Sequence, residues 1–190
     1  MGILNVTPDS FSDGGKYLDP NDAIAHGIEM LNEGVDIIDV GGESTRPGAQ
    51  RITAEEELNR VLPVITELKK LGAKVSVDTM RASVAQASGA DIINDVSGGK
   101  ADPKMFETVA ELNTPYVLMH WRGHSTEMDQ KAIYQNVVTE VISELMLQVE
   151  LAIAAGIKKE KLILDPGLGF AKNVEQNWEI VTNISEFQKL

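Results

Sequence analysis

Six short apolar runs in the sequence end in polar side chains that could bind or activate a substrate. The runs are rich in Val, Ile and Leu, and the residues near their ends are Asn5, Asp39, Glu43, Asp78, Thr79, Asn94, Asp95, His120 and Asp165. One such residue is typical of a cap or a turn, but capping does not account for all six ends. The pattern predicts a polar site along one edge of a parallel sheet.

Three of these residues have the chemistry to read a heterocyclic ring. Asp78, Asn94 and Asp165 follow three different runs, and their oxygens can accept paired hydrogen bonds from an amino group beside a ring N–H. Guanine and pterin edges both have this shape. A buried network that links strands is the alternative, and Asp95 is expected to point the other way and support the fold.

Two polar segments follow the first two runs. TPDSFSDGG spans residues 7–15 and ESTRPGAQR spans residues 43–51. They are interpreted either as solvated turns or as lids that carry Arg46 and Arg51 to a charged substrate. His120 and His124 are weak indications of a metal site, and Lys172 is typical of a solvated lysine.

The apolar runs themselves predict six parallel strands. Helices are expected between them, with readable caps at Asp19-Pro20, Gly34, Thr53, Gly72 and Gly156. Pro63 should kink the second helix or mark its start. The predicted strands cover residues 2–6, 36–42, 74–79, 91–97, 116–121 and 161–167, and the clearest helices cover 53–71 and 135–155, with a last helix from about Glu175.

Repeated βα units restrict the fold to an open doubly wound sheet or a barrel. The G-x-G-x-x-G fingerprint of a dinucleotide-binding fold is absent, so we expect an α/β fold of the (β/α)8 TIM-barrel type. Eight units usually need about 250 residues. With about six units in 190 residues, the chain is expected to be a single domain over residues 1–190 that is truncated before strands seven and eight.

Composition excludes several classes of partner. The net charge of −12 argues against nucleic acid and anionic membrane surfaces, and no apolar stretch is long enough to span a bilayer. Without cysteine the chain has no disulfide and no thiolate metal site, which fits a cytoplasmic protein.

The motifs LNVTPDSFSDGG, GGESTRPGA, VDT, INDVSGG, MHWRG and LDPGLGFAK resemble the dihydropteroate synthase family from end to end of the chain. The resemblance implies condensation of 6-hydroxymethyl-7,8-dihydropterin pyrophosphate with para-aminobenzoate, the step of folate biosynthesis that sulfonamides inhibit. It also implies Mg²⁺ as cofactor and a homodimer.

Roles follow position by position from the resemblance. Asp78, Asn94 and Asp165 resemble the residues that read the pterin, with Met119 as an apolar contact, and Asn5 resembles the residue that helps to hold Mg²⁺. The remaining matches concern the second substrate and the loops: Thr45 resembles a substrate contact, and Phe11, Arg46, Pro47 and Phe170 fall in the para-aminobenzoate and sulfonamide region.

The resemblance leaves alternatives open. The family has further basic residues on strands seven and eight, so the 190-residue chain alone is expected to be inactive and poorly stable. A pterin-dependent methyltransferase shares the barrel and the Asp/Asn pattern, although its family does not match the two long loops. A catalytically silent paralogue that only binds a pterin is the third reading.

Overall fold

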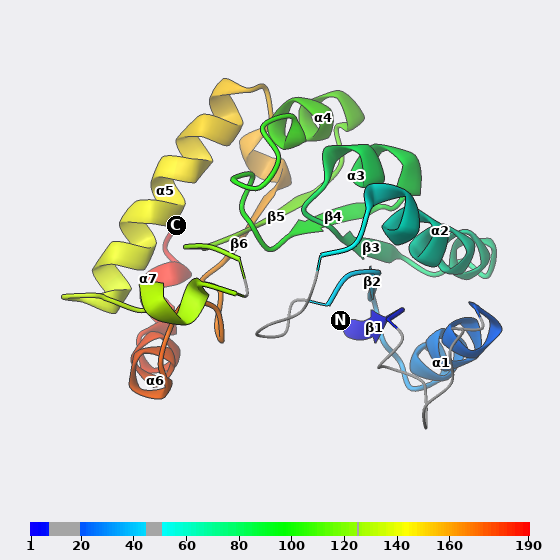
Figure 1. The fold of residues 1–190 in the computed structure, drawn as a ribbon, viewed down its shortest axis with the longest axis horizontal. Helices are drawn as coiled ribbons and strands as arrows, with labels where there is room; N and C mark the ends of the chain where they lie inside the picture. Colours follow the sequence, from blue (N-terminus) through cyan, green and yellow to red (C-terminus); the bar gives the residue numbers. More distant parts are fainter. Residues whose placement is uncertain (8–19, 45–50, 125) are drawn as a thin grey trace. The chain divides into compact units, whose positions relative to one another are not determined.

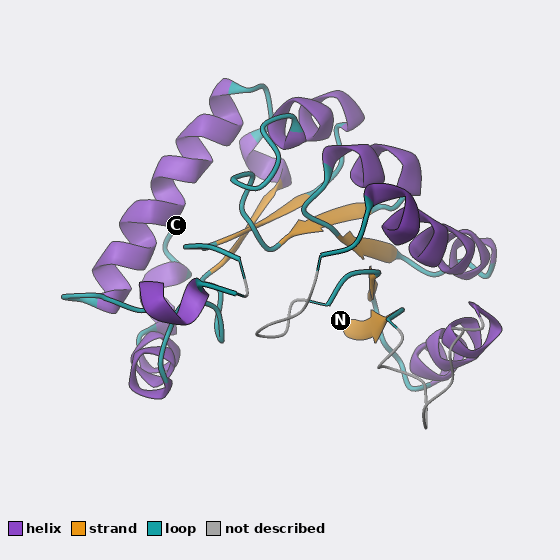
Figure 2. Cartoon of the chain, viewed as in Figure 1, coloured by secondary structure: helices purple, strands orange, loops and turns teal. Residues whose placement is uncertain are grey.

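The computed structural model describes residues 1–7, 20–44, 51–124 and 126–190 (Figure 1). The described chain divides into two compact units, with the division inside the fourth strand, between Asn94 and Asp95. Each unit alternates parallel strands with helices, as Figure 2 shows, which confirms the α/β class predicted from the apolar runs.

The first unit carries a parallel strand layer in the order β1, β2, β3, β4, with sequential neighbours paired. Helix α1 packs on α2, and α2 packs on α3. The elements in chain order are β1 (Gly2–Asn5), α1 (Pro20–Asn32), β2 (Ile38–Gly41), α2 (Ala54–Lys70), β3 (Val75–Asp78), α3 (Ala82–Ser88) and β4 (Ile92–Asp95).

The second unit contains two paired parallel strands, β5 and β6, and helix α5 packs on β5 and on α6. Its elements in chain order are α4 (Met105–Leu112), β5 (Tyr116–Met119), η1 (Met128–Lys131), α5 (Val137–Ala154), η2 (Lys159–Lys161), β6 (Leu162–Asp165), α6 (Val174–Thr182) and α7 (Ile184–Phe187).

All six predicted strands are present, each within its predicted range. Strands β2 and β5 are buried at every position, as expected for strands covered on both faces. Strands β1 and β6 differ from this expectation, because Ile3 and Ile163 are 67% and 46% exposed. Apolar character therefore predicted the strands but not the burial of both faces.

Helix α2 begins where its cap predicts. The Thr53 hydroxyl accepts a hydrogen bond from the Glu56 N–H at 3.1 Å. The Glu56 carboxylate pairs with Arg60 Nη2 at 2.5 Å, one turn further along the helix. Because the helix starts at Ala54, Pro63 lies inside it and does not mark its start.

Helix α5 begins after Asn136, whose side-chain oxygen accepts from the Thr139 N–H at 2.9 Å. From the sequence alone, the spacing of Val138, Ile142, Leu145, Val149 and Ile153 predicts the apolar stripe of this helix. The buried residues are Val137, Val141, Leu145, Val149 and Ala152, so Leu145 and Val149 agree and the other three predicted positions lie one residue too late. The residues at the predicted and at the observed positions are all apolar, so packing against β5 and α6 decides which of them are buried.

Candidate active site

Three strand ends of the first unit lie at the same level. In the strand pairing Asn5 is opposite Gly41, and Gly41 is opposite Asp78. A Cβ atom on Gly41 would lie 3.2 Å from Asn5 Oδ1 and 3.6 Å from Asp78 Oδ2. The missing side chain at Gly41 therefore leaves a small space between an amide oxygen and a carboxylate oxygen.

The next strand end adds an oriented amide. Asn94 is opposite Asp78 in the pairing of β3 and β4, and its Nδ2 donates to Asp39 Oδ2 at 2.9 Å. Burial raises the pKa of Asp39, and the hydrogen bond from Asn94 opposes this rise. Because an ionised carboxylate only accepts, it holds the Asn94 NH2 group and leaves the Asn94 carbonyl oxygen for another donor.

An ion-pair network holds the base of the second polar segment. Arg81 pairs with the buried carboxylate of Glu57 and, through Nη2, with Glu43 Oε2 at 2.7 Å. Glu43 also accepts from Arg51 Nε at 3.1 Å and from the Ile52 N–H at 3.2 Å. The two ends of this segment are thus joined through Glu43. Arg51, predicted as a possible substrate contact, is part of this structural network.

The strand ends of the second unit are also level with each other. Met119 is opposite Asp165, and Met119 is 4% exposed. Asp165 Oδ1 accepts from the Gly167 N–H at 2.7 Å, which starts a tight turn after β6. Gly167 has φ +69°, and a Cβ there would lie 2.4 Å from the His120 carbonyl oxygen, so the turn requires glycine.

Asp95 supports the fold, as predicted from its alternation with Asn94. It is fully buried, and it accepts hydrogen bonds from Ser97 N–H and Oγ, from Gly99 N–H and from the Tyr116 hydroxyl. Burial raises the pKa of Asp95, and these hydrogen bonds oppose the rise. The Tyr116 bond, at 2.7 Å, ties Asp95 to the start of β5 within the second unit.

A buried polar cluster joins the end of β5 to the segment after β6. Lys172 Nζ lies 3.1 Å from His120 Nδ1, and His120 Nε2 lies 3.0 Å from Glu144 Oε2. Burial lowers the pKa of His120 to about 4, with the charge of Lys172 acting in the same direction. Burial also lowers the pKa of Lys172 to about 7, although the nearby carboxylate of Asp165 opposes this.

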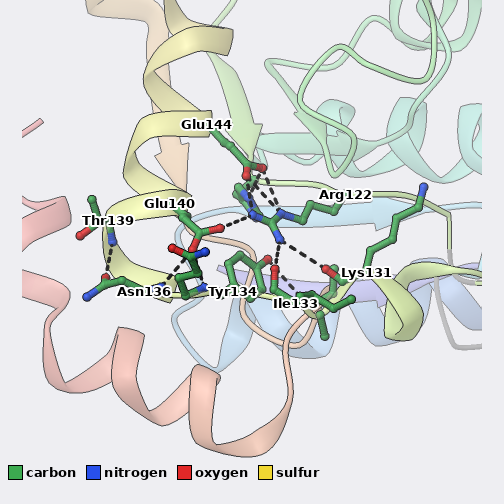
Figure 3. A network of polar contacts seen from close by, with 12 residues as sticks. Arg122, Lys131, Ile133, Tyr134, Asn136, Thr139, Glu140 and Glu144 are labelled. Carbon is green, nitrogen blue, oxygen red and sulfur yellow. Dashed lines mark hydrogen bonds and ion pairs between the residues drawn. The ribbon is translucent and has the colours of Figure 1, made fainter.

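Glu144 is held in turn by Arg122, from the segment after β5 (Figure 3). Arg122 Nη2 pairs with Glu144 Oε1 at 2.5 Å and with Glu140 Oε2 at 3.0 Å, and its guanidinium carbon lies 3.7 Å from the Tyr134 ring centre. Arg122 Nη1 also donates to the Ile133 carbonyl at 2.6 Å. These contacts fix the segment between β5 and α5 against the helix.

The comparisons with known proteins identify the family to which this chain belongs. A sequence model described as "Pterin binding enzyme" matches residues 1–190. A dihydropteroate synthase from Mycobacterium leprae is 53% identical over 190 residues, which cover 98% of this chain and 67% of the relative. The chain belongs to the dihydropteroate synthase family.

Solved structures of dihydropteroate synthases agree with this assignment. The enzyme from Xanthomonas albilineans with 4-aminobenzoic acid has a TM-score of 0.90 and 42% identity, covering 100% of this chain and 68% of that one. The enzyme from Anaplasma phagocytophilum with bound 6-hydroxymethylpterin-monophosphate has a TM-score of 0.87 and 37% identity, covering 99% and 73%. The predicted relation to the TIM barrels of the synthase family is confirmed.

The chain spans about two thirds of the length of these relatives, between 66% and 70% for four bacterial synthases. The structure does not test whether residues 1–190 form one domain, and this stays a prediction. Among the described residues, none of the helices has the length and apolar character needed to cross a membrane.

The structure places six of the ten predicted site residues. It brings Asn5, Asp78 and Asn94 together in the first unit, and Met119 and Asp165 together in the second. Phe170, half-buried, donates its N–H to the Gly167 carbonyl at 3.1 Å. The other four, Phe11, Thr45, Arg46 and Pro47, lie outside the described residues.

Sequence reasoning missed two of the supporting residues, Asp39 as the partner of Asn94 and Lys172 as a buried amine. Asp39 is a carboxylate inside an apolar strand, which is a usable signal for a supporting role. Lys172 gave no such signal, because its partner His120 is 52 residues away in the sequence.

Proposed function

We propose that this site reads a dihydropterin pyrophosphate and helps to join it to para-aminobenzoate, with release of pyrophosphate. The observation that carries the proposal is the cluster of oxygen acceptors at the ends of β1, β3 and β4. Asn5, Asp78 and Asn94 lie at one level, and Gly41 leaves space beside them. Such acceptors match the amino group and ring N–H of a pterin.

The roles of individual residues follow from what each can donate or accept. The Asp78 carboxylate accepts from the pterin amino group and ring N–H, and the Asn94 carbonyl, oriented by Asp39, accepts a further N–H. Asp165 and Met119 are assigned to pterin binding from the family resemblance, and Phe170 to the para-aminobenzoate region.

The chemical step needs no strong base. The bond between the pterin methylene carbon and the diphosphate oxygen breaks, and the diphosphate leaves with the electron pair. The arylamine nitrogen of para-aminobenzoate forms the new C–N bond and then loses a proton to water. Exclusion of other nucleophiles and stabilisation of charge are the main requirements of this step.

Asn5 fits the magnesium site of the family. Its amide oxygen faces the space above Gly41, beside Asp78, and Mg²⁺ commonly takes few protein oxygens together with phosphate and water. When bound, Mg²⁺ would neutralise charge on the leaving diphosphate. Among the described residues, no group of three or more His, Asp or Glu side chains could hold a metal by itself.

The 190-residue chain by itself is proposed to be inactive. The relatives are longer by about a third of their length, and β1 and β6 expose Ile3 and Ile163. For functional tests we therefore define the completed enzyme as residues 1–190 joined to the part of the Mycobacterium leprae relative that they do not match. The completed enzyme should turn over, and the 190-residue chain should not.

The pterin assignment is tested by Asp78→Asn in the completed enzyme. Replacing a charged acceptor by a neutral amide should weaken binding of 6-hydroxymethylpterin monophosphate by about tenfold. Asp22→Asn, on the exposed face of α1, is the matched control and should bind as the parent does. Equal affinity of Asp78→Asn and the parent, measured by calorimetry, would remove Asp78 from the pocket.

A further inference from the structure

Lys172 has a buried amino group with three acceptors around it. Lys172 is 8% exposed. Its Nζ donates to the carbonyl oxygens of Gly167 at 2.8 Å and of Phe170 at 2.9 Å. The third neighbour is His120 Nδ1 at 3.1 Å. Three acceptors match the three N–H bonds of an ammonium group.

The contacts of His120 decide which of its nitrogens accepts. His120 Nε2 lies 3.0 Å from the Glu144 carboxylate, so it carries the proton and donates, and Nδ1 is left to accept from Lys172. The lowered pKa of His120, about 4 because of its burial, keeps the ring neutral near pH 7. Arg122 also pairs with Glu144, through Nη2 and Oε1 at 2.5 Å, as Figure 3 shows.

The segment that Lys172 binds has an unusual backbone. Gly167, Gly169 and Ala171 all have positive φ, and Ala171, at φ +48°, is a non-glycine residue in the left-handed region. The same segment begins with Asp165, whose Oδ1 accepts from the Gly167 N–H, and contains Phe170. The strained conformation at Ala171 persists only where the surrounding structure holds it.

We propose that Lys172, held by His120 and Glu144, is a positioning residue for the two predicted substrate contacts Asp165 and Phe170. By binding the Gly167 and Phe170 carbonyls it fixes the turn that aims both side chains. The expected effect of Lys172 on substrate binding rests on the proposed function. Its effect on the conformation of the turn does not depend on that function.

The test uses Lys172→Met in the completed enzyme, with the exposed Lys104→Met as matched control. Measurements at pH 6, below the pKa of about 7 that burial gives Lys172, keep the ammonium form prevalent in the parent. Hydrogen exchange of the backbone amides in residues 166–171 reports the turn. The dissociation constant of 6-hydroxymethylpterin monophosphate and the KM for para-aminobenzoate report the two substrate contacts.

We expect faster exchange in residues 166–171 and a loss of about tenfold in both substrate measurements, with cooperative unfolding retained. Chemical rescue of the variant distinguishes the contribution of the ammonium group from that of side-chain packing. Because the chain has no cysteine, Lys172→Cys can be alkylated in denaturant with bromoethylamine and refolded, after cysteines of the added part are replaced by serine. Bromopropane gives the uncharged counterpart. Only the aminoethyl product should recover parent values.

Unchanged exchange in folded Lys172→Met would overturn the proposal, and so would equal values for the aminoethyl and propyl products. Unchanged substrate constants despite faster exchange would also overturn it, because the turn would then not position the contacts. A parent enzyme that binds neither substrate, with faster exchange still seen in Lys172→Met, would instead identify the proposed function as the part that fails.

Discussion

Asp39 is predicted to control pterin affinity without touching the ligand. Its Oδ2 accepts from Asn94 Nδ2 at 2.9 Å, and its side chain is 5% exposed. The substitution Asp39→Asn keeps the size and shape of the side chain but gives it an amide. That amide can either donate or accept, so Asn94 loses the constraint that turns its carbonyl oxygen to the ligand.

The size of the effect follows from the kind of hydrogen bond. A bond to a charged group contributes about 1.5 to 3 kcal/mol and a neutral bond about 0.5 to 1.5 kcal/mol, so the exchange costs about 1.3 kcal/mol between the midpoints of the two ranges. This difference corresponds to about tenfold weaker binding of 6-hydroxymethylpterin monophosphate. Because burial raises the pKa of Asp39, the parent is measured at pH 8, where the ionised form is favoured.

The assay is calorimetric titration of the completed enzyme and of Asp39→Asn with the same pterin. Asp36→Asn, at the exposed start of the same chain segment, is the control and should bind like the parent. Thermal unfolding checks that the variants are folded. Parent-like affinity of Asp39→Asn, or an equal loss in Asp36→Asn, would refute the claim that the carboxylate orients Asn94.

Three further outcomes are expected. Gly41→Ala places a methyl group 3.2 Å from Asn5 Oδ1, and the crowding should weaken pterin binding by about threefold in the same titration, whereas unchanged affinity would mean that the space is not used. Gly42→Ala overlaps Val61 Cγ1 at 2.8 Å and should lower the free energy of unfolding by about 1 to 3 kcal/mol in urea, a result that a parent-like midpoint would contradict. Burial lowers the pKa of His120 from 6.5 to about 4, so the folded state binds fewer protons and the free energy of unfolding should fall by about 3 kcal/mol as pH decreases from 6.5 to 4. His120→Gln should lose this part of the pH dependence, and an identical slope in both proteins would count against the burial of a neutral ring.

Much of the fold could be predicted because its signals are local. Each strand is a run of apolar residues, and Thr53 begins its helix with a hydroxyl that caps the first turn. The buried face of α5 could not be fixed in the same way. Val137 and Val138 are equally apolar, and the same holds for Val141 and Ile142, so only packing in three dimensions selects one member of each pair.

The positions of the site residues could be predicted where those residues lie at the ends of strands. Asp78 and Asn94 were expected to lie together because parallel strands end at one edge, and the pairing of β3 and β4 places them opposite each other. The supporting groups were not predictable in this way. Lys172 becomes a buried ammonium only through carbonyl groups of its own turn and through His120, which directly follows β5, and neither contact leaves a pattern in the sequence.

The most direct test of the account is pyrophosphate release by the completed enzyme, supplied with dihydropterin pyrophosphate and Mg²⁺, with and without para-aminobenzoate. We predict release that depends on para-aminobenzoate and that yields one dihydropteroate for each pyrophosphate. Binding of the pterin without any release under either condition would contradict the synthase account and would identify a catalytically silent pterin-binding relative.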